Sequence, residues 1–164
     1  MYAFTCAHRE YPFGTKLKVI NIVNNRSVNC LVNDRGPFVS GRDLDLSYAA
    51  AREIGLIGSG TAKVWVEYLG RDSSYIKEVR YISDAGPFTV QVGSFRDISN
   101  AERLKKALEL KYRMVYIAQA QIQGNTFFRV RLGRFQTKED VSRFAKSLAY
   151  EGYSVYIAKD EEKI

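Results

Sequence analysis

Residues 33–38 read NDRGPF, and they end an apolar run at residues 28–32 that is typical of a β-strand. Proline has no N–H to donate to a neighbouring strand, and glycine adopts backbone angles closed to other residues, so Gly36 and Pro37 predict a turn. Asp34 is therefore expected at the open end of a strand. Such a position suits either a carboxylate that fixes the loop or a catalytic one.

Around this turn, the first half of the chain reads mostly as β-structure. Residues 14–22 alternate apolar and polar side chains, and residues 27–32 return as a partner strand after an Asn-Asn turn. Ser47 predicts the start of a short helix over residues 48–54, and residues 62–69 alternate again as a final strand. These elements predict a compact barrel, and a closed barrel of six strands normally needs roughly twenty more residues before the first of them.

The second half contains a repeat with an offset of forty residues. Residues 90–95, VQVGSF, match residues 130–135, VRLGRF, and the VYIA of residues 115–118 recurs at residues 155–158. Each copy predicts one β-α-β unit, and a tight hairpin at residues 123–125 joins the two copies. The predicted order is therefore βαββαβ, which is a split, ferredoxin-like arrangement.

Helix starts and a polar segment suggest where the domains begin and end. Ser99 and Thr137, each followed three residues later by an acidic residue, predict the starts of the two helices in the repeat. Residues 71–86 are polar, carry balanced charge and run into Gly-Pro, so they predict a linker that can contain a short strand. We therefore expect a first domain over residues 1–70 and a second over residues 87–160.

The positive charge of the chain is concentrated in its second half. The 164 residues carry a net charge of +7; residues 1–70 hold eight Lys and Arg against six Asp and Glu, whereas residues 85–164 hold fourteen against nine. This excess favours a polyanionic partner, such as a nucleic acid or an acidic glycan, or else an ordinary solubilising surface. No apolar run reaches the roughly 18 residues of a transmembrane helix.

Cysteine and histidine are too scarce to predict a metal site. The chain contains Cys6, Cys30 and His8 and no other residue of these two types. That set is too small for a zinc framework, so neither a metal nor a cofactor is expected. The two cysteines can form one disulfide in an oxidising compartment or serve as two small buried hydrophobic residues, and we favour the second interpretation.

Five segments together resemble a known family. They are TCAHREYPFGTKLKV, NDRGPF and GRDLDLSYAAAREIG in the first half, and PFTVQVGSF and FRVRLGRF in the second. In this order they are similar to the rare lipoprotein A family, the septal lytic transglycosylases of bacterial envelopes. The resemblance implies a fold that is mainly β plus α+β, namely a partial double-psi β-barrel followed by a βαββαβ ferredoxin-like SPOR domain.

The resemblance also implies an enzyme that cuts between N-acetylmuramic acid and N-acetylglucosamine in peptide-free glycan strands. The C6 hydroxyl of the sugar attacks and leaves a 1,6-anhydro end, so one principal acid/base suffices. Asp34 is carried over to that role from NDRGPF, and His8 is placed beside it as a catalytic residue that hydrogen-bonds Asp34 or the substrate. A carboxyl group that donates a proton at neutral pH needs burial or a second carboxylate nearby.

Further site residues are expected around Asp34. Arg35 should leave the opposite face of the strand, and it is a predicted substrate-binding residue together with Asp45 and Tyr48. Asp45 alternatively has only a structural role, before a helix whose positive end it favours. Family members carry a lipoprotein signal and a catalytic Glu ahead of the position of Met1. A non-catalytic, peptidoglycan-binding envelope protein is therefore the alternative function.

The second domain is expected to bind the same polymer. Glycan strands without stem peptides expose the lactyl carboxylate of each muramic acid, and Arg129, Arg131 and Arg134 are predicted to favour these carboxylates. By resemblance, Gln91 and Ser94 are expected to contact the glycan. These residues make peptide-free glycan strands the expected partner.

Tyr116 and Tyr156 occupy equivalent positions in the repeat, where they either stack on sugars or cover the helices. An RNA-recognition module shares the βαββαβ order, but neither GSFRDI nor GRFQTK supplies its aromatic pattern, so nucleic acid is not an expected partner. We expect a monomer in the bacterial cell envelope or periplasm, enriched at the division septum. A membrane tether is expected only through an N-terminal lipoprotein signal outside these residues, as in an outer-membrane lipoprotein.

Overall fold

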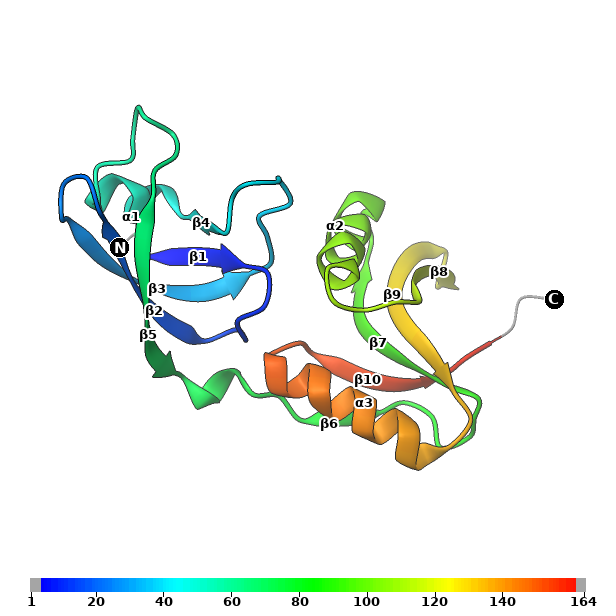
Figure 1. The fold of residues 1–164 in the computed structure, drawn as a ribbon. Coiled ribbons are helices and arrows are strands. Elements are labelled where there is room, and N and C mark those ends of the chain that lie inside the picture. Colours follow the sequence, from blue (N-terminus) through cyan, green and yellow to red (C-terminus); the bar gives the residue numbers. More distant parts are fainter. Residues whose placement is uncertain (1–3, 162–164) are drawn as a thin grey trace. The chain divides into compact units, whose positions relative to one another are not determined.

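The computed structural model describes residues 4–161, and these divide into two compact units between Tyr75 and Ile76 (Figure 1). Each unit is built on its own five-stranded sheet. The first unit is mostly β-structure and the second packs two helices on its sheet, so the predicted fold class of mainly β plus α+β is confirmed. No helix within residues 4–161 is long and apolar enough to cross a membrane.

The first unit contains five strands and one α-helix within the described residues. They are β1 (Thr5–His8), β2 (Thr15–Asn21), β3 (Ser27–Asp34), β4 (Leu44–Leu46), α1 (Tyr48–Glu53) and β5 (Val64–Arg71), followed by the short 3₁₀-helix η1 (Ser73–Tyr75). The strands lie in the order β4-β1-β3-β2-β5, and only the β1–β3 pair is parallel. The β2–β3 connection turns at Asn25, whose φ of 60° fits the predicted Asn-Asn turn.

Alternation along the strands selects the core of the first unit. Every second side chain of β2 and β3 points inward, and α1 packs against this inner face. The buried cluster consists of Cys6, Leu17, Val19, Val28, Cys30, Val32, Ala50 and Ile54. Ser47 is the predicted helix cap, and its hydroxyl accepts a hydrogen bond from the backbone N–H of Ala50 at 3.3 Å.

Strand β5 lies at the edge of the first sheet, and its core face is open. Val66 pairs with Val19 and Tyr68 pairs with Leu17, so both side chains share the inner face of β2. They nevertheless remain 38% and 60% exposed, whereas Leu17 and Val19 are fully buried. Within the described residues, the barrel is therefore not covered on its β5 side.

The second unit contains the predicted βαββαβ order and one additional strand. Its elements are β6 (Val79–Tyr81), β7 (Phe88–Phe95), α2 (Ile98–Glu109), β8 (Val115–Ile122), β9 (Asn125–Phe135), α3 (Lys138–Glu151) and β10 (Val155–Lys159). The strand order is β6-β10-β7-β9-β8. Gln123 and Gly124 have φ values of 50° and 77° at the β8–β9 turn, as the predicted hairpin requires. The short strand allowed within residues 71–86 is β6, which pairs with β10 in parallel.

The two helices of the second unit begin at different kinds of cap. Thr137 caps α3 as predicted, because its hydroxyl accepts a hydrogen bond from Asp140 N–H at 3.2 Å. The predicted start of α2 at Ser99 is wrong by two residues, because Asp97 is the cap. The Asp97 carboxylate accepts from both the backbone N–H and the hydroxyl of Ser99, at 2.9 and 2.7 Å, so Ser99 donates to the cap.

The buried amide of Asn21 predicts a measurable loss of stability. Its Nδ2 donates to the Ile54 carbonyl at 2.9 Å and so joins the end of β2 to the end of α1. The variant Asn21→Ala should lower the free energy of unfolding by about 1 kcal/mol. A buried hydrogen bond is lost, while the Asn24 side chain still donates to the Ile54 carbonyl at 3.1 Å. Urea unfolding of the full chain, followed by fluorescence of the single tryptophan, Trp65, measures the loss in the first unit.

The matched control is Asn29→Ala, because Asn29 is an exposed residue of β3. Its effect should stay within about 0.5 kcal/mol. Equal losses in the two variants would contradict the role assigned to Asn21.

Candidate functional site

Three neighbouring strands bring two carboxylates to the same row of the first sheet. Ala7 of β1 pairs with Asp34 of β3 on one side and with Asp45 of β4 on the other. Neighbouring strands lie about 4.8 Å apart, so the two aspartate Cα atoms are expected about 10 Å apart. His8 follows Ala7 as the last residue of β1. The structure thus gathers His8, Asp34 and Asp45, which the sequence separates by up to 37 positions.

Asp34 is the last residue of β3 and is exposed to solvent. A β-bulge between Cys6 and Ala7 shifts the pairing so that Asp34 lies opposite Ala7. The carboxylate Oδ1 accepts a hydrogen bond from the Arg35 backbone N–H at 2.8 Å. The expected turn follows, with Gly36 at a φ of 137°. Asp34 therefore stands at the open end of β3, in the same row of the sheet as Asp45.

Arg35 points into the protein, and only 6% of the residue is exposed. Its Nη1 donates to the carbonyls of Tyr11 and His8, at 2.7 and 3.3 Å. The guanidinium also lies over the Phe13 ring, 4.1 Å from the centroid. These contacts make Arg35 a support for the β1–β2 loop, and the predicted contact with substrate stays a prediction.

His8 is half-buried, and its ring is oriented by the backbone. Nδ1 accepts hydrogen bonds from the N–H groups of Glu10 and Tyr11, both at 3.0 Å. The proton of the neutral ring therefore lies on Nε2, which remains available as a donor. Burial lowers the pKa of His8 most strongly. The charge of Glu10 opposes this shift, while the charges of Arg35 and Arg9 add to it.

Arg9 has a structural role that the sequence analysis missed. Its Nε donates to the Pro37 carbonyl at 2.9 Å and its Nη2 to the Val39 carbonyl at 3.2 Å, and Nη1 lies 3.7 Å from the carboxylate of Asp43. One side chain thus ties the β3–β4 loop to the end of β1. The only sequence signal was its place beside His8, because a side chain that binds distant carbonyls leaves no local pattern.

Asp45 and Tyr48 lie on either side of the start of α1. Leu44 and Leu46 pack against the core, so Asp45 between them faces away from it. Its two carboxylate oxygens each lie 3.2 Å from Nη2 of Arg42. Tyr48 is the first residue of α1 and is 69% exposed. Both side chains are accessible to a ligand, and their predicted binding roles stay predictions.

A second set of predicted residues forms one row across the sheet of the second unit. Tyr156 pairs with Gln91, Gln91 with Arg131, and Arg131 with Tyr116. The Arg131 Nε donates to the Gln91 side-chain carbonyl at 3.2 Å, and both residues are 8% exposed. The intervening side chains, such as fully buried Val90, form the core under the helices. The row therefore lies on the opposite face, and the tyrosines do not cover the helices.

The neighbouring rows add two arginines with different surroundings. Ser94 pairs with Arg129, and the Nε of Arg129 is buried without a hydrogen-bond partner among the described residues. Arg134 lies 3.5 Å from the Asp160 carboxylate, which offsets its charge. Tyr116 is also fixed here, since its hydroxyl donates to Asp160 at 3.1 Å. Among these groups, Arg129 has the most evident unmet hydrogen-bonding capacity.

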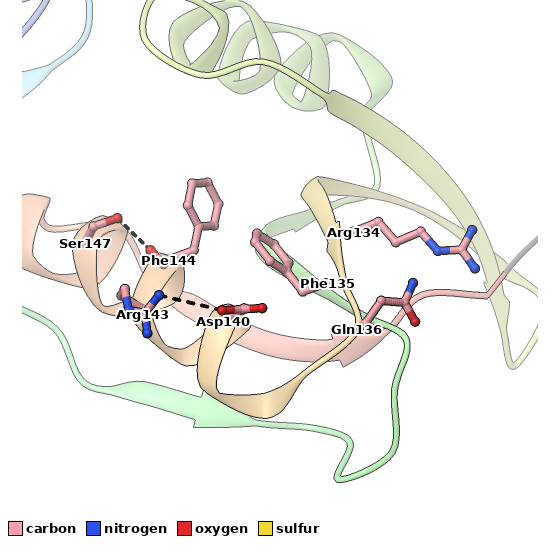
Figure 2. A pocket seen from close by; sticks show the side chains of 7 residues that line it. All are labelled: Arg134, Phe135, Gln136, Asp140, Arg143, Phe144 and Ser147. Atoms are coloured by element: carbon pink, nitrogen blue, oxygen red, sulfur yellow. Dashed lines mark hydrogen bonds and ion pairs between the residues drawn. The ribbon is translucent and has the colours of Figure 1, made fainter.

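A hollow of about 650 Å³ lies at the β9–α3 corner of the second unit. It is lined by Arg134, Phe135, Gln136, Asp140, Arg143, Phe144 and Ser147. Figure 2 shows the rings of Phe135 and Phe144 facing each other, and their centroids lie 5.2 Å apart. Of the residues predicted to bind glycan, only Arg134 reaches this hollow, so it is separate from the row around Gln91.

His8 should titrate below the ordinary histidine pKa of 6.5. The unfolded chain then binds a proton more readily than the folded chain. The resulting stabilisation is complete above about pH 6.5 and is lost as the pH falls through the folded-state pKa. Because His8 is the only histidine, its ring signals can be followed by NMR in a pH titration of the full chain.

The comparison variant for this titration is Glu10→Gln. It keeps the backbone N–H that binds His8 but removes the charge that raises the pKa of His8 most, so the pKa should fall further. A wild-type pKa at or above 6.5 would contradict the arrangement described.

Two protein-family models match the chain. Residues 1–66 match the model described as lytic transglycolase, and residues 84–159 match the model described as SPOR domain. A solved structure, the SPOR domain of RlpA from Pseudomonas aeruginosa, covers 44% of this chain and 99% of its own, with 29% identity and a TM-score of 0.38.

Curated relatives align with almost all of the chain. The endolytic peptidoglycan transglycosylase RlpA of Campylobacter jejuni is 37% identical over 92% of this chain, and that of Helicobacter pylori strain J99 is 34% identical over 89%. The chain covers 60% and 52% of these two relatives, so it spans little more than half of their length. With both family models matched in the same order, the chain belongs to the rare lipoprotein A (RlpA) family.

Proposed function

We propose that this protein is a peptidoglycan lytic transglycosylase that cuts peptide-free glycan strands and holds them with its second unit. The observation that carries the proposal is the row of Asp34, Ala7 and Asp45, with His8 next to Ala7 on β1. An exposed acid at a rigid strand end, with a second carboxylate and a neutral imidazole near it, suits acid/base chemistry on a sugar. The names of the relatives support the same substrate class.

In the proposed reaction, Asp34 moves one proton between two sugar oxygens. The bond between C1 of N-acetylmuramic acid and O4 of N-acetylglucosamine breaks, and Asp34 gives its proton to O4. The C6 hydroxyl of the muramic acid then forms the new bond to C1, and its proton returns to Asp34. No water is consumed, and the carboxyl group ends as it began.

The neighbours of Asp34 support this cycle in different ways. Asp45 lies on the next strand but one and presents a second carboxylate on the same side of the sheet. The Nε2–H of His8 donates a hydrogen bond to the sugar or to Asp34. Arg35 keeps the β1–β2 loop in place and thereby holds the His8 ring in position. Tyr48 offers an exposed ring as a sugar platform.

The face of the second sheet opposite the helices is the proposed glycan-binding surface. Gln91, Ser94, Arg129 and Arg131 lie in two adjoining rows of this face. An acceptor oxygen from a ligand would satisfy the buried Nε of Arg129. Lactyl carboxylates of peptide-free strands provide such oxygens, and a stem peptide would convert each into a neutral amide. This difference explains the proposed preference for peptide-free strands.

The same proposal bears on where the protein acts in the cell and on the uncovered β5 side of the barrel. A peptidoglycan-cutting protein acts in the bacterial cell envelope, and the second unit would direct it to septal wall rich in peptide-free strands. The core-facing but exposed Val66 and Tyr68 on β5 need cover. We propose that this face of β5 is covered by another polypeptide segment in the working enzyme.

The variant Asp34→Asn tests the catalytic half of the proposal. An amide cannot donate or accept the proton, so release of anhydro-ended products from peptide-free glycan should fall by about 10²- to 10⁴-fold. The assay uses the full-length protein and product detection by mass spectrometry. Asp84→Asn is the control, because Asp84 is 91% exposed and belongs to the second unit. Full activity in Asp34→Asn would refute the mechanism. If the wild-type protein released no product, the catalytic proposal would fail and the alternative, a non-catalytic peptidoglycan-binding protein, would stand.

The variants Arg129→Gln and Arg131→Gln test the binding half. Loss of one charged hydrogen bond to a carboxylate should weaken the affinity for peptide-free glycan by at least about tenfold. Arg143→Gln is the matched control, because Arg143 is on α3 with 80% of its side chain exposed. Circular dichroism checks that the variants are folded. Unchanged affinity in both folded variants would exclude this face as the grip.

A further inference from the structure

Two thiols meet in the core of the first unit. Cys6 of β1 and Cys30 of β3 are each 3% exposed, and their Sγ atoms lie 2.7 Å apart. A disulfide bond measures about 2.05 Å, so a movement of about 0.7 Å, shared between two side chains, would close the bond. Two sulfur atoms that only pack against each other keep a wider separation. This distance suits a bonded pair better than the two independent hydrophobic residues that the sequence favoured.

We propose that Cys6 and Cys30 form a disulfide that clamps β1 to β3. The two strands are parallel neighbours, and Cys6 faces the core beside Val32, which shares the inner face of β3 with Cys30. The bond closes a loop between residues separated by 24 positions, and such a constraint on the unfolded chain stabilises the fold. The proposal rests on the geometry of the sulfur atoms and stands whether or not the protein cuts glycan.

The chemistry requires an external disulfide as oxidant, such as an oxidoreductase of the envelope or oxidised glutathione in the test tube. The Cys30 thiolate attacks one sulfur of that disulfide and displaces a thiol. The Cys6 thiolate then attacks Cys30 Sγ in the mixed disulfide and displaces the second thiol. The oxidant gains two electrons and two protons, and the two cysteines lose them.

Burial sets the time at which the bond can form. With 3% of each residue exposed, an oxidant cannot reach either thiol in the folded unit. Oxidation must therefore occur while the chain folds, before β1 and β3 close over the core. Once formed, the bond is protected from reductants by the same burial. A stable structural disulfide of this kind is typical of a protein that folds in an oxidising compartment.

The clamp lies directly behind the candidate site. Cys6 is two residues before His8 on β1, and Cys30 is four residues before Asp34 on β3. A covalent link between these strands limits the sliding of one past the other, and it therefore keeps His8 and Asp34 in register.

The direct test is a thiol count on the full chain. The protein is unfolded with reductant, refolded with oxidised and reduced glutathione, then denatured without reductant and treated with an alkylating agent. We expect neither cysteine to be alkylated, and a proteolytic fragment that joins the Cys6 and Cys30 peptides. Two alkylated cysteines, or glutathione adducts without the joined fragment, would overturn the proposal.

A second measurement tests the stabilising effect. Reduction of the refolded wild-type protein under denaturing conditions, followed by refolding with reductant, should lower the melting temperature of the first unit by about 5 °C or more. The same treatment should leave the melting temperature of Cys30→Ala unchanged. Because the wild-type protein is compared with itself, the result does not depend on the stability of the variant. A melting temperature of the wild-type protein that is independent of reductant would contradict the clamp.

Discussion

The pairing of β1 with two strands at once is the constraint on which the candidate site depends. Ala7 lies between Asp34 and Asp45, so the short β1 decides which part of β3 faces which part of β4. Without this double pairing, the two carboxylates would lie at the ends of a ten-residue connection with no fixed separation. Backbone hydrogen bonds between the strands therefore set the positions of the two carboxylates, and side-chain contacts only add to this.

Two arginines extend this constraint into the loops. Arg35 donates to carbonyls of the β1–β2 loop, and Arg9 donates to carbonyls of the β3–β4 loop. Each arginine donates hydrogen bonds to loop carbonyls that would otherwise need water as their donor. The β-bulge explains the division of roles between neighbours. It resets the alternation of β3 after Val32, so that Asp34 pairs with Ala7 and is exposed while Arg35 turns inward. One motif thus supplies both the exposed acid and a support for its surroundings.

Local patterns allowed much of the fold to be predicted. Alternation identified β2 and β3, the forty-residue repeat identified βαββαβ, and glycine and asparagine identified the two hairpin turns. These features depend on residues close together in the chain. The cap of α2 was misplaced because Asp97 and Ser99 are both capping residues, and only the structure decides which of them accepts.

The candidate site was predictable only in part. Motifs indicated Asp34 and His8, but the pairing of Asp45 across Ala7 depends on strand register, which no local pattern contains. The role of Arg9 depends on a loop about thirty positions away. The sequence also left undecided which face of the sheet Tyr116 occupies, because that face follows from its pairing with Arg131.

The central claim is that the carboxyl group of Asp34 acts on the glycosidic oxygen. The most direct measurement is a crystal structure of the full-length Asp34→Asn variant with a peptide-free glycan oligomer bound. The account predicts a glycosidic O4 at about 2.6–3.2 Å from the side chain at position 34, with the muramic acid C6 hydroxyl on the same side. A glycan that passes through the barrel domain with every glycosidic oxygen out of reach of that side chain would contradict it.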